Sequence, residues 1–201
     1  FNMNNDAKVL IAYPGDFLSY PKFERKVARI ISSLEKVELI CVSDENHFCK
    51  RLSEEHQLHF TICANEKAAL DLATHAILFQ DGERNCFFLL YNELRDRDIP
   101  IRTLNLKITK VSNKDLGQRY DVYIGRGTLW GNPYQIGAEG TRDEVIAKYS
   151  YDFERRFVKL PEKFNENIEK LRGKTLGCHC KPAACHGDVI AHYLNSIDDG
   201  E

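Results

Sequence analysis

The sequence lacks an excess of charge of either sign, and it lacks a long run of apolar residues. The formal net charge is −2 over 201 residues, whereas proteins devoted to duplex nucleic acid are usually strongly basic, because phosphate neutralisation supplies most of their affinity. No segment approaches the ~20 apolar residues that a membrane-spanning helix needs, and the N-terminus shows no secretory pattern. We therefore expect neither a membrane span nor strong binding to duplex nucleic acid.

Familiar signatures of nucleotide and metal sites are missing as well. The sequence has no dinucleotide-binding fingerprint, no Walker loop and no cluster of metal-binding carboxylates. Its seven cysteines are odd in number and scattered, which is unlike a secreted disulfide framework and typical of a reducing cytoplasm. The first four are expected to be small buried apolar side chains within strands and helices. They are Cys41, Cys49, Cys63 and Cys86.

Residues 7–106 alternate between strand and helix patterns. Apolar runs predict five strands, at residues 8–14, 37–43, 58–63, 75–81 and 99–106. Apolar residues at helical spacing predict helices between them, at residues 21–34, 45–56, 66–73 and 85–98. Such alternation implies right-handed crossovers, so we predict an α/β fold with a doubly wound, mainly parallel sheet of the Rossmann-like kind.

Ligands of doubly wound sheets bind beyond the carboxyl ends of the strands. The first such end is "YPGDFLSYP", residues 13–21. With the longer stretch "VLIAYPGDFLSYPKFERKV" and the strand–helix order after it, this half resembles the SLOG group of Rossmann-like domains. The resemblance implies binding of a nucleotide or a nucleotide-derived signal through a glycine-rich phosphate loop after the second strand.

The chain departs from that group at the phosphate loop. The segment after the second strand, "CVSDENHFCKR", contains no glycine, so the backbone cannot easily bring several N–H groups close to a phosphate. Asp44 and Glu45 would also repel a phosphate. We therefore predict a degenerate, structural SLOG-type domain over residues 1–106. Nucleotide binding through Gly15 and Asp16 is the alternative.

After residue 106 the alternation stops, and a smaller α+β domain is predicted over residues 107–201. Its strands are predicted at residues 107–113, 120–126 and 173–180, and its helices at residues 141–157, 161–171 and 184–197. Thr141 is suited to cap the first of these helices, which carries acidic residues in its first turn.

Several motifs of this half occur in a fixed order. The pattern "YIGRG..WGNP", followed by "LRGK.LGC.C.P..CHGD", is similar to a family of bacterial and phage proteins classed as a domain of unknown function. The similarity runs from about Thr109 to the C-terminus, and it departs from the family at His179, where the family has an aromatic residue. It implies a bacterial or phage origin, with the host-cell cytoplasm as the location of a phage protein, but no particular reaction.

The glycine-rich loop "YIGRGTLWGNPYQIG" is predicted to bind the ligand. Its glycines let a ligand approach the backbone closely, and Arg126 offers a planar fork for a phosphate or carboxylate. Trp130 could stack on a base, and Asn132 could contact an amide or a base edge. The alternative is a tight turn with a buried tryptophan. The predicted ligand-binding residues are Tyr123, Gly125, Arg126, Gly127, Trp130, Gly131, Asn132 and Lys174.

The segment "GCHCKPAACHGD" has three interpretations. In the first, Cys185 is a nucleophile activated by the N-terminus of the helix that follows, with His186 and Asp188 as acid/base and orienting groups. In the second, a zinc ion is bound, although the spacing differs from that of two separated ligand pairs. Its ligands would be Cys178, Cys180 and Cys185, with His186 as the fourth. In the third, the thiols are buried, His186 bonds to the backbone and Asp188 caps a helix.

The sequence therefore predicts two alternative functions for one pocket. The first is a nucleotide- or nucleobase-directed enzyme of the hydrolytic or group-transfer type, with Arg126, Trp130 and Asn132 binding the ligand and the cysteine–histidine segment supplying the chemistry. The second is a non-catalytic protein that binds the same small nucleotide-like ligand, for example a phage factor that captures a host nucleotide signal. No cofactor other than the zinc ion considered above is expected.

Overall fold

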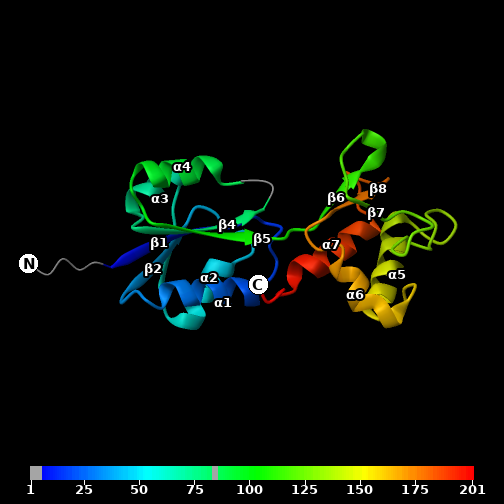
Figure 1. Cartoon of the computed structure of the whole chain (residues 1–201), viewed down its shortest axis with the longest axis horizontal. Helices are drawn as coiled ribbons and strands as arrows, with labels where there is room; N and C mark the ends of the chain where they lie inside the picture. Colours follow the sequence, from blue (N-terminus) through cyan, green and yellow to red (C-terminus); the bar gives the residue numbers. More distant parts are fainter. Residues whose placement is uncertain (1–5, 83–85) are drawn as a thin grey trace, which may run out of the picture. The chain divides into compact units, whose positions relative to one another are not determined.

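The computed structural model describes residues 6–82 and 86–201. The chain divides into two compact units (Figure 1). The N-terminal unit contains the chain up to Leu106 together with Ile197–Glu201, and the C-terminal unit is Lys107–Ser196. The second domain was expected to run to residue 201, whereas the last five residues group with the N-terminal unit.

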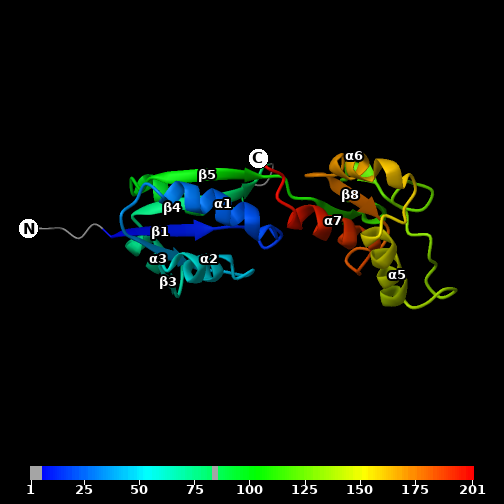
Figure 2. The same ribbon diagram turned by 90° about the horizontal axis from the view of Figure 1, so that it is seen from below.

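The N-terminal unit is built on a five-stranded sheet with the order β3-β2-β1-β4-β5, and every neighbouring pair is parallel. Its strands are β1 (Ala7–Ala12), β2 (Val37–Cys41), β3 (His59–Ile62), β4 (His75–Asp81) and β5 (Ile101–Leu106). Its helices are α1 (Tyr20–Ile31), α2 (Phe48–His56), α3 (Glu66–Leu72) and α4 (Phe88–Asp96). Helices α1 and α2 cover one face of the sheet, and α3 and α4 cover the other (Figures 1 and 2). This confirms the predicted doubly wound fold.

The pattern of buried residues explains this architecture. Val9, Leu10 and Ile11 are each 1% exposed, so side chains on both faces of β1 are covered, as a central parallel strand requires. Helix α1 begins after Ser19, whose hydroxyl accepts a hydrogen bond from the backbone N–H of Lys22. One cysteine differs from expectation, because Cys86 is exposed.

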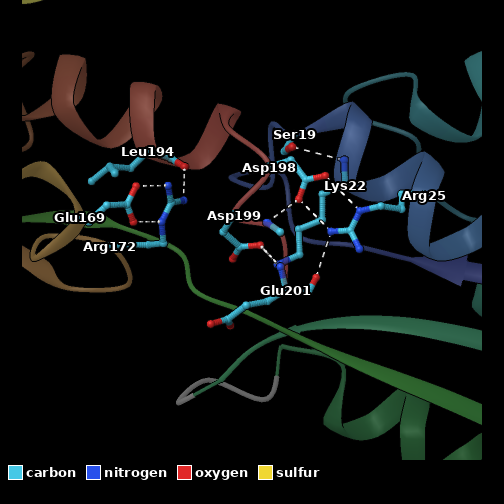
Figure 3. A network of polar contacts seen from close by, with 10 residues as sticks. Ser19, Lys22, Arg25, Glu169, Arg172, Leu194, Asp198, Asp199 and Glu201 are labelled. Atoms are coloured by element: carbon cyan, nitrogen blue, oxygen red, sulfur yellow. Dashed lines mark hydrogen bonds and ion pairs between the residues drawn. The ribbon is translucent and has the colours of Figure 1, made fainter. Parts of the chain in front are cut away.

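The C-terminal tail contacts the N-terminal unit through ion pairs (Figure 3). Lys22 on α1 pairs with Asp199 at 2.6 Å, and both side chains are nearly buried. Arg25 on the next turn forms two hydrogen bonds with the Asp198 carboxylate, at 2.8 and 3.1 Å. These two contacts explain why the tail groups with the first sheet.

The C-terminal unit contains a three-stranded parallel sheet with the order β6-β8-β7. Its strands are β6 (Lys110–Asn113), β7 (Val122–Tyr123) and β8 (Thr175–Cys178). Its helices are η1 (Lys114–Leu116), α5 (Arg142–Glu154), η2 (Pro161–Lys163), α6 (Phe164–Glu169) and α7 (His186–Ser196). Thr141 caps α5 in a capping box with Glu144, as its position predicted. Over the described residues, no helix is both long and apolar enough to cross a membrane.

Candidate functional site

The three strands of the C-terminal unit are parallel, so their carboxyl ends meet at one edge of the sheet. Tyr123 ends β7, His179 directly follows β8, and Asp115 lies in η1, immediately after β6. The carboxyl edge of a parallel sheet is where ligands commonly bind, because the loops that leave the strands converge there. This edge is therefore the candidate site.

A cavity of about 310 Å³ lies at this edge. The glycine-rich loop and the cysteine–histidine segment both line it, although they lie about fifty residues apart in the chain. The lining residues that the sequence predicted as site or zinc residues are Tyr123, Gly125, Arg126, Asn132, Cys178, Cys180, Cys185 and His186. The other lining residues are Tyr134, Ile136, Arg142, Val145, Ile146, His179 and Ala184.

Trp130 does not line the cavity. Its side chain is buried in the core of the unit, with ring centroids 6.2 Å from Phe153 and 5.8 Å from Phe164. The Tyr149 hydroxyl donates a hydrogen bond to its carbonyl oxygen at 2.8 Å. The expected stacking on a base is therefore not available in this arrangement, because other aromatic side chains enclose the indole.

Three further predicted ligand-binding residues also lie outside the cavity. Lys174 precedes β8, at the amino end of the strand, about 13 Å along the sheet from the carboxyl edge. Gly127 has a φ of +86° and supports a turn of the loop. A side chain at Gly131 would bring its Cβ 2.6 Å from the carbonyl oxygen of Gly125, so glycine is needed there for close contact between two backbone segments.

Cys185 is the N-terminal capping residue of α7. Its sulfur accepts a hydrogen bond from the N–H of Gly187 at 3.3 Å, and its own N–H donates to the Asp188 carboxylate at 2.9 Å. Burial, followed by the neighbouring Cys178, raises the pKa of Cys185 to about 12. Burial therefore outweighs the helix N-terminus, which was expected to lower this pKa. Asp188 lies outside the cavity and forms an ion pair with Lys181.

His186 lines the cavity but is fixed by the backbone. Its Nε2–H donates a hydrogen bond to the carbonyl oxygen of Ile124 at 2.8 Å, since a carbonyl can only accept. Burial lowers the pKa of His186, which favours the neutral ring at neutral pH. In that form Nδ1 carries the lone pair, and His186 can act as a hydrogen-bond acceptor or a weak base.

The three thiols of the segment lie close together without forming a complete metal site. The sulfur atoms of Cys178 and Cys185 are 3.5 Å apart, and the N–H of Cys180 donates to the Cys178 sulfur at 3.4 Å. Within residues 6–82 and 86–201, no group of three or more His, Cys, Asp or Glu side chains is arranged to hold a metal ion. The zinc interpretation stays a prediction.

A chain of hydrogen bonds links Asp115, His179 and Tyr123 at the rim of the cavity. Nδ1 of His179 lies 2.7 Å from the Asp115 carboxylate, and Nε2 lies 2.8 Å from the Tyr123 hydroxyl. From the sequence, His179 stands out only as a departure from a family pattern, and Asp115 was not predicted as a site residue. A signal was available, because Asp115 lies two residues beyond the predicted strand at residues 107–113, where the carboxyl-end rule places ligand contacts.

Asn113 and Gly125 hold this chain in position. The buried Asn113 side chain accepts a hydrogen bond from the N–H of Asp115 at 2.9 Å and donates to the carbonyl oxygens of His179 and Lys181 at 3.3 and 2.6 Å. It therefore fixes both loops that carry the polar side chains. A Cβ at position 125 would collide with the Tyr123 hydroxyl, so glycine there makes room for the tyrosine to reach His179.

Two arginines bring positive charge to the cavity. Arg126 is exposed, and no ion pair of its side chain occurs in the part of the chain that the structure describes. Arg142 donates one hydrogen bond to the carbonyl oxygen of Ala184 at 3.1 Å, which leaves other N–H groups of its guanidinium for a ligand. Asn132 is more restricted, because its side chain bonds to the backbone of Tyr134 and Val145.

At the carboxyl edge of the sheet in the N-terminal unit, hydrogen-bond donors are paired with a side chain of the protein itself. The buried Asp44 carboxylate accepts hydrogen bonds from the backbone N–H groups of Cys49 and Lys50, each at 2.9 Å, and from the Tyr13 hydroxyl at 2.6 Å. Burial and the bond to Asp44 raise the pKa of Tyr13. A carboxylate of the protein therefore stands at the N-terminus of α2, where an anionic ligand would otherwise bind. Beside it, the Glu45 carboxylate lies against Gly15.

Arg172, two residues before Lys174, has structural partners in the C-terminal unit (Figure 3). Its guanidinium forms two hydrogen bonds with the Glu169 carboxylate, both at 2.8 Å. A third bond goes to the carbonyl oxygen of Leu194 near the end of α7, at 2.8 Å, where a cation complements the helix dipole.

Comparisons with known proteins agree with this division of the chain. Residues 6–112 match the family described as Minimal SLOG domain, and residues 108–196 match the family described as Domain of unknown function (DUF4326). A relative in Enterobacteria phage T4, described as an uncharacterized 12.4 kDa protein in the nrdA-td intergenic region, is 44% identical over 92 residues. The matched region covers 45% of this chain and 82% of the relative. No solved structure matches the chain.

Both resemblances stated from the sequence are therefore confirmed. The first family covers slightly more than half of the chain, and the phage relative is covered over most of its own length. The chain belongs to the minimal SLOG domain family through its N-terminal unit and to the DUF4326 family through its C-terminal unit.

Proposed function

We propose that the cavity of the C-terminal unit binds a nucleotide-like ligand, and that the protein is a nucleotide- or nucleobase-directed enzyme of the hydrolytic or group-transfer type. The observation that carries this proposal is the convergence of Arg126 and Arg142 with His179 and His186 around one cavity. Membership in the minimal SLOG domain family suggests a nucleotide-related function and supports this class of ligand.

Positive charge and apolar surface define the ligand that the cavity would accept. Arg126 and Arg142 can form charge-assisted, bidentate hydrogen bonds to a phosphoryl group. Ile136, Val145 and Ile146 supply apolar contacts for a flat base or a sugar. Because the volume of about 310 Å³ lies at the lower end of the usual range for ligand pockets, we propose a single nucleoside monophosphate or a smaller fragment as the ligand.

The catalytic roles expected of Cys185, His186 and Asp188 stay predictions. The raised pKa of Cys185 keeps its thiol protonated at neutral pH, which opposes a role as nucleophile in the ligand-free protein. His186 retains a free acceptor nitrogen if its ring is neutral, so it is the better placed of the three to exchange a proton with a ligand. Asp188 contributes through the helix cap, by accepting the hydrogen bond of the Cys185 N–H.

The second candidate function is binding without turnover, as in a protein that captures a host nucleotide signal. The observation that favours it is the structural use of the cysteine–histidine segment, in which the Cys185 sulfur and the Asp188 carboxylate both cap α7. Such a protein would use the same arginines and the same apolar contacts, and the only role of Cys185 would be to cap α7.

The ligand is the first quantity to measure. The purified full chain would be denatured, and the small molecules released would be identified by mass spectrometry, with elemental analysis for zinc on the same preparation. The common nucleoside 5′-monophosphates would then be titrated into the protein by calorimetry. We expect at least one of them to bind, and the absence of binding by every member of the panel would contradict the proposed ligand class.

Variants then separate the two candidate functions. Arg126→Ala is expected to weaken binding of the best monophosphate by about tenfold to hundredfold, the effect of losing a charge-assisted hydrogen bond. Arg155→Ala is the matched control, because this exposed arginine stacks on Tyr151 and does not line the cavity. Cys185→Ala tests turnover: lost product formation with retained binding supports a catalytic cysteine, and unchanged product formation excludes it. If the wild type binds a monophosphate and releases no product from any of the panel, binding without turnover is the better description.

A further inference from the structure

We propose that Asp115, His179 and Tyr123 form a proton-transfer chain that ends in the cavity, with the Tyr123 hydroxyl as the group that exchanges a proton with the bound ligand. The proposal rests on the proposed function, because it assigns a reaction step to the same cavity. Tyr123 and His179 line that cavity, and Asp115 contacts His179 from η1.

The hydrogen-bond partners determine which atom donates and which accepts at each step of the proton-transfer chain. A carboxylate is only an acceptor, so Nδ1 of His179 carries the proton that is shared with Asp115 at 2.7 Å. In the neutral ring Nε2 is then the acceptor, and the Tyr123 hydroxyl donates to it at 2.8 Å. The same three roles, an orienting carboxylate, an imidazole base and a hydroxyl, recur in enzymes that activate a hydroxyl group.

The exposure of these side chains argues against a purely structural role. The Asp115 and His179 side chains are 57% and 45% exposed, and an exposed ion pair contributes little to folding stability. The surrounding chain nevertheless holds them with a buried asparagine, Asn113, and with a glycine at position 125 that makes room for Tyr123. Rigid support of an exposed polar arrangement is typical of a functional site.

The proton-transfer chain can catalyse the hydrolysis of a phosphate ester. A water molecule in the cavity would transfer a proton to the Tyr123 oxygen while the phenolic proton passes to Nε2 of His179. The water oxygen would form a bond to phosphorus, and the bond from phosphorus to the ester oxygen would break with its electron pair. The leaving oxygen would then receive the proton from the His179 imidazolium through Tyr123, so that all three groups return to their starting states.

Arg126 and Arg142 would hold the phosphoryl group during this step, and Lys114 adds a further positive charge near the chain. Its ammonium lies 4.8 Å from the centre of the Tyr123 ring, where a cation–π contact helps to hold the ring in place. Asp115 contacts neither the cavity nor the ligand, so it is a positioning residue that acts through the imidazole.

The first test uses the free protein and needs no ligand. Nitrogen-15 NMR of the imidazole rings would determine the tautomer of neutral His179. We expect the Nδ1-protonated form in the wild type and a mixture of tautomers in Asp115→Asn, whose side chain no longer favours one ring orientation. The signals lost in His179→Gln identify those of His179, and His192→Gln, on the exposed side of α7, is the control that leaves them unchanged. A wild-type His179 protonated at Nε2 would overturn the proposal.

The second test measures turnover by the release of inorganic phosphate from nucleoside 5′-monophosphates. Tyr123→Phe and His179→Gln are expected to lower kcat by about a hundredfold or more, the usual size of an acid–base contribution. Asp115→Asn should lower kcat by a smaller factor and change the shape of the pH–rate profile, as expected for a positioning residue. Tyr151→Phe is the control, because Tyr151 is an exposed residue of α5 outside the cavity.

The outcomes distinguish this proposal from the proposed function. If the wild type binds a monophosphate and Tyr123→Phe keeps both binding and kcat, the proton-transfer chain is wrong and the ligand assignment stands. If His179 shows the expected tautomer and no monophosphate binds, the ligand class is wrong and the hydrogen-bond arrangement is correct. Binding without phosphate release from any monophosphate would overturn the catalytic step.

Discussion

The two units of this chain both contain parallel sheets, and they differ at the edge where such sheets bind ligands. In the N-terminal unit the Asp44 carboxylate occupies the N-terminus of α2 and satisfies two backbone N–H groups. In the C-terminal unit the carboxyl edge opens on a cavity of about 310 Å³ that two arginines line. The same topological position is therefore filled by the protein in one unit and left open in the other.

A carboxylate at the carboxyl edge of the sheet has a structural role in one unit and contributes to the candidate site in the other. Asp44 is buried and accepts three hydrogen bonds, so it stabilises the fold and excludes an anion. Asp115 is exposed and orients a histidine whose other nitrogen reaches a cavity residue. Burial and the number of partners, more than residue type, decide which carboxylate is structural.

The largest effect is expected from removing the Asp44 carboxylate, which occupies the N-terminus of α2. Asp44→Ala leaves the Tyr13 hydroxyl and two backbone N–H groups without their acceptor, so we expect a loss of about 3 to 5 kcal/mol in the stability of the N-terminal unit. Hydrogen exchange of the β1–β4 amides would measure it. Asn65→Ala is the control, since Asn65 caps α3 through one bond to Ala68 and should cost only about 1 kcal/mol. Equal losses in both variants would show that Asp44 is an ordinary helix cap.

The second prediction concerns the tail that groups with the N-terminal unit. Asp199→Ala leaves the ammonium of Lys22, whose side chain is only 7% exposed, without its ion-pair partner. We expect the N-terminal unit to lose about 2 to 3 kcal/mol, and hydrogen exchange in α1 to increase. Exchange in α5 and α7 should stay as it is in the wild type, because those helices belong to the other unit. A uniform increase over both units would contradict this assignment.

Much of the fold was predictable from the sequence, because alternating apolar runs and amphipathic helices restrict the connections of a parallel sheet. The capping box at Thr141 could also be located, since its residue types are specific. The second sheet was harder, because β7 has only two residues and is held by its pairing with β8. So short a strand has no periodicity of its own, and tertiary contacts determine it.

The candidate site was predictable in part. The grouping of Arg126 with Cys185 and His186 in one cavity was expected, and the structure brings these residues together. The role of Trp130 could not be read from the sequence, because a tryptophan in a glycine-rich loop can face either a ligand or the core. Asp115 was missed because its place beyond a predicted strand does not name its partner, and only the pairing of β6 with β8 brings it to His179.

The third prediction tests the geometry of the open site. Gly125→Ala places a Cβ where the Tyr123 hydroxyl lies, so the tyrosine must move and its hydrogen bond to His179 should be lost. We expect kcat for phosphate release to fall by about tenfold to hundredfold, with little change in the stability of the unit, since the displaced side chain is partly exposed. Gly82→Ala provides the control for an added methyl group, because a Cβ at Gly82 would meet only the carbonyl oxygen of Leu106, at 3.8 Å. If Gly125→Ala retains the wild-type His179 tautomer and activity, a glycine at position 125 is not needed for the hydrogen bond between Tyr123 and His179.

The last prediction concerns the titration of the buried Cys185 thiol at high pH. Since burial raises the pKa of Cys185 from 9.0 to about 12, the folded state keeps a proton that the unfolded chain loses between these values. The contribution of the Cys185 thiol to the free energy of unfolding is therefore fully present below pH 9, and it is lost as the pH rises toward 12. Cys185→Ser keeps an oxygen to cap α7 and removes the titrating thiol, so its stability should fall less steeply from pH 9 to 11 in urea titrations. The tyrosines whose pKa is also raised are present in both proteins, so their contribution cancels in the difference. Parallel curves for the two proteins would show that Cys185 ionises in the folded state near its ordinary pKa, which would restore it as a candidate nucleophile.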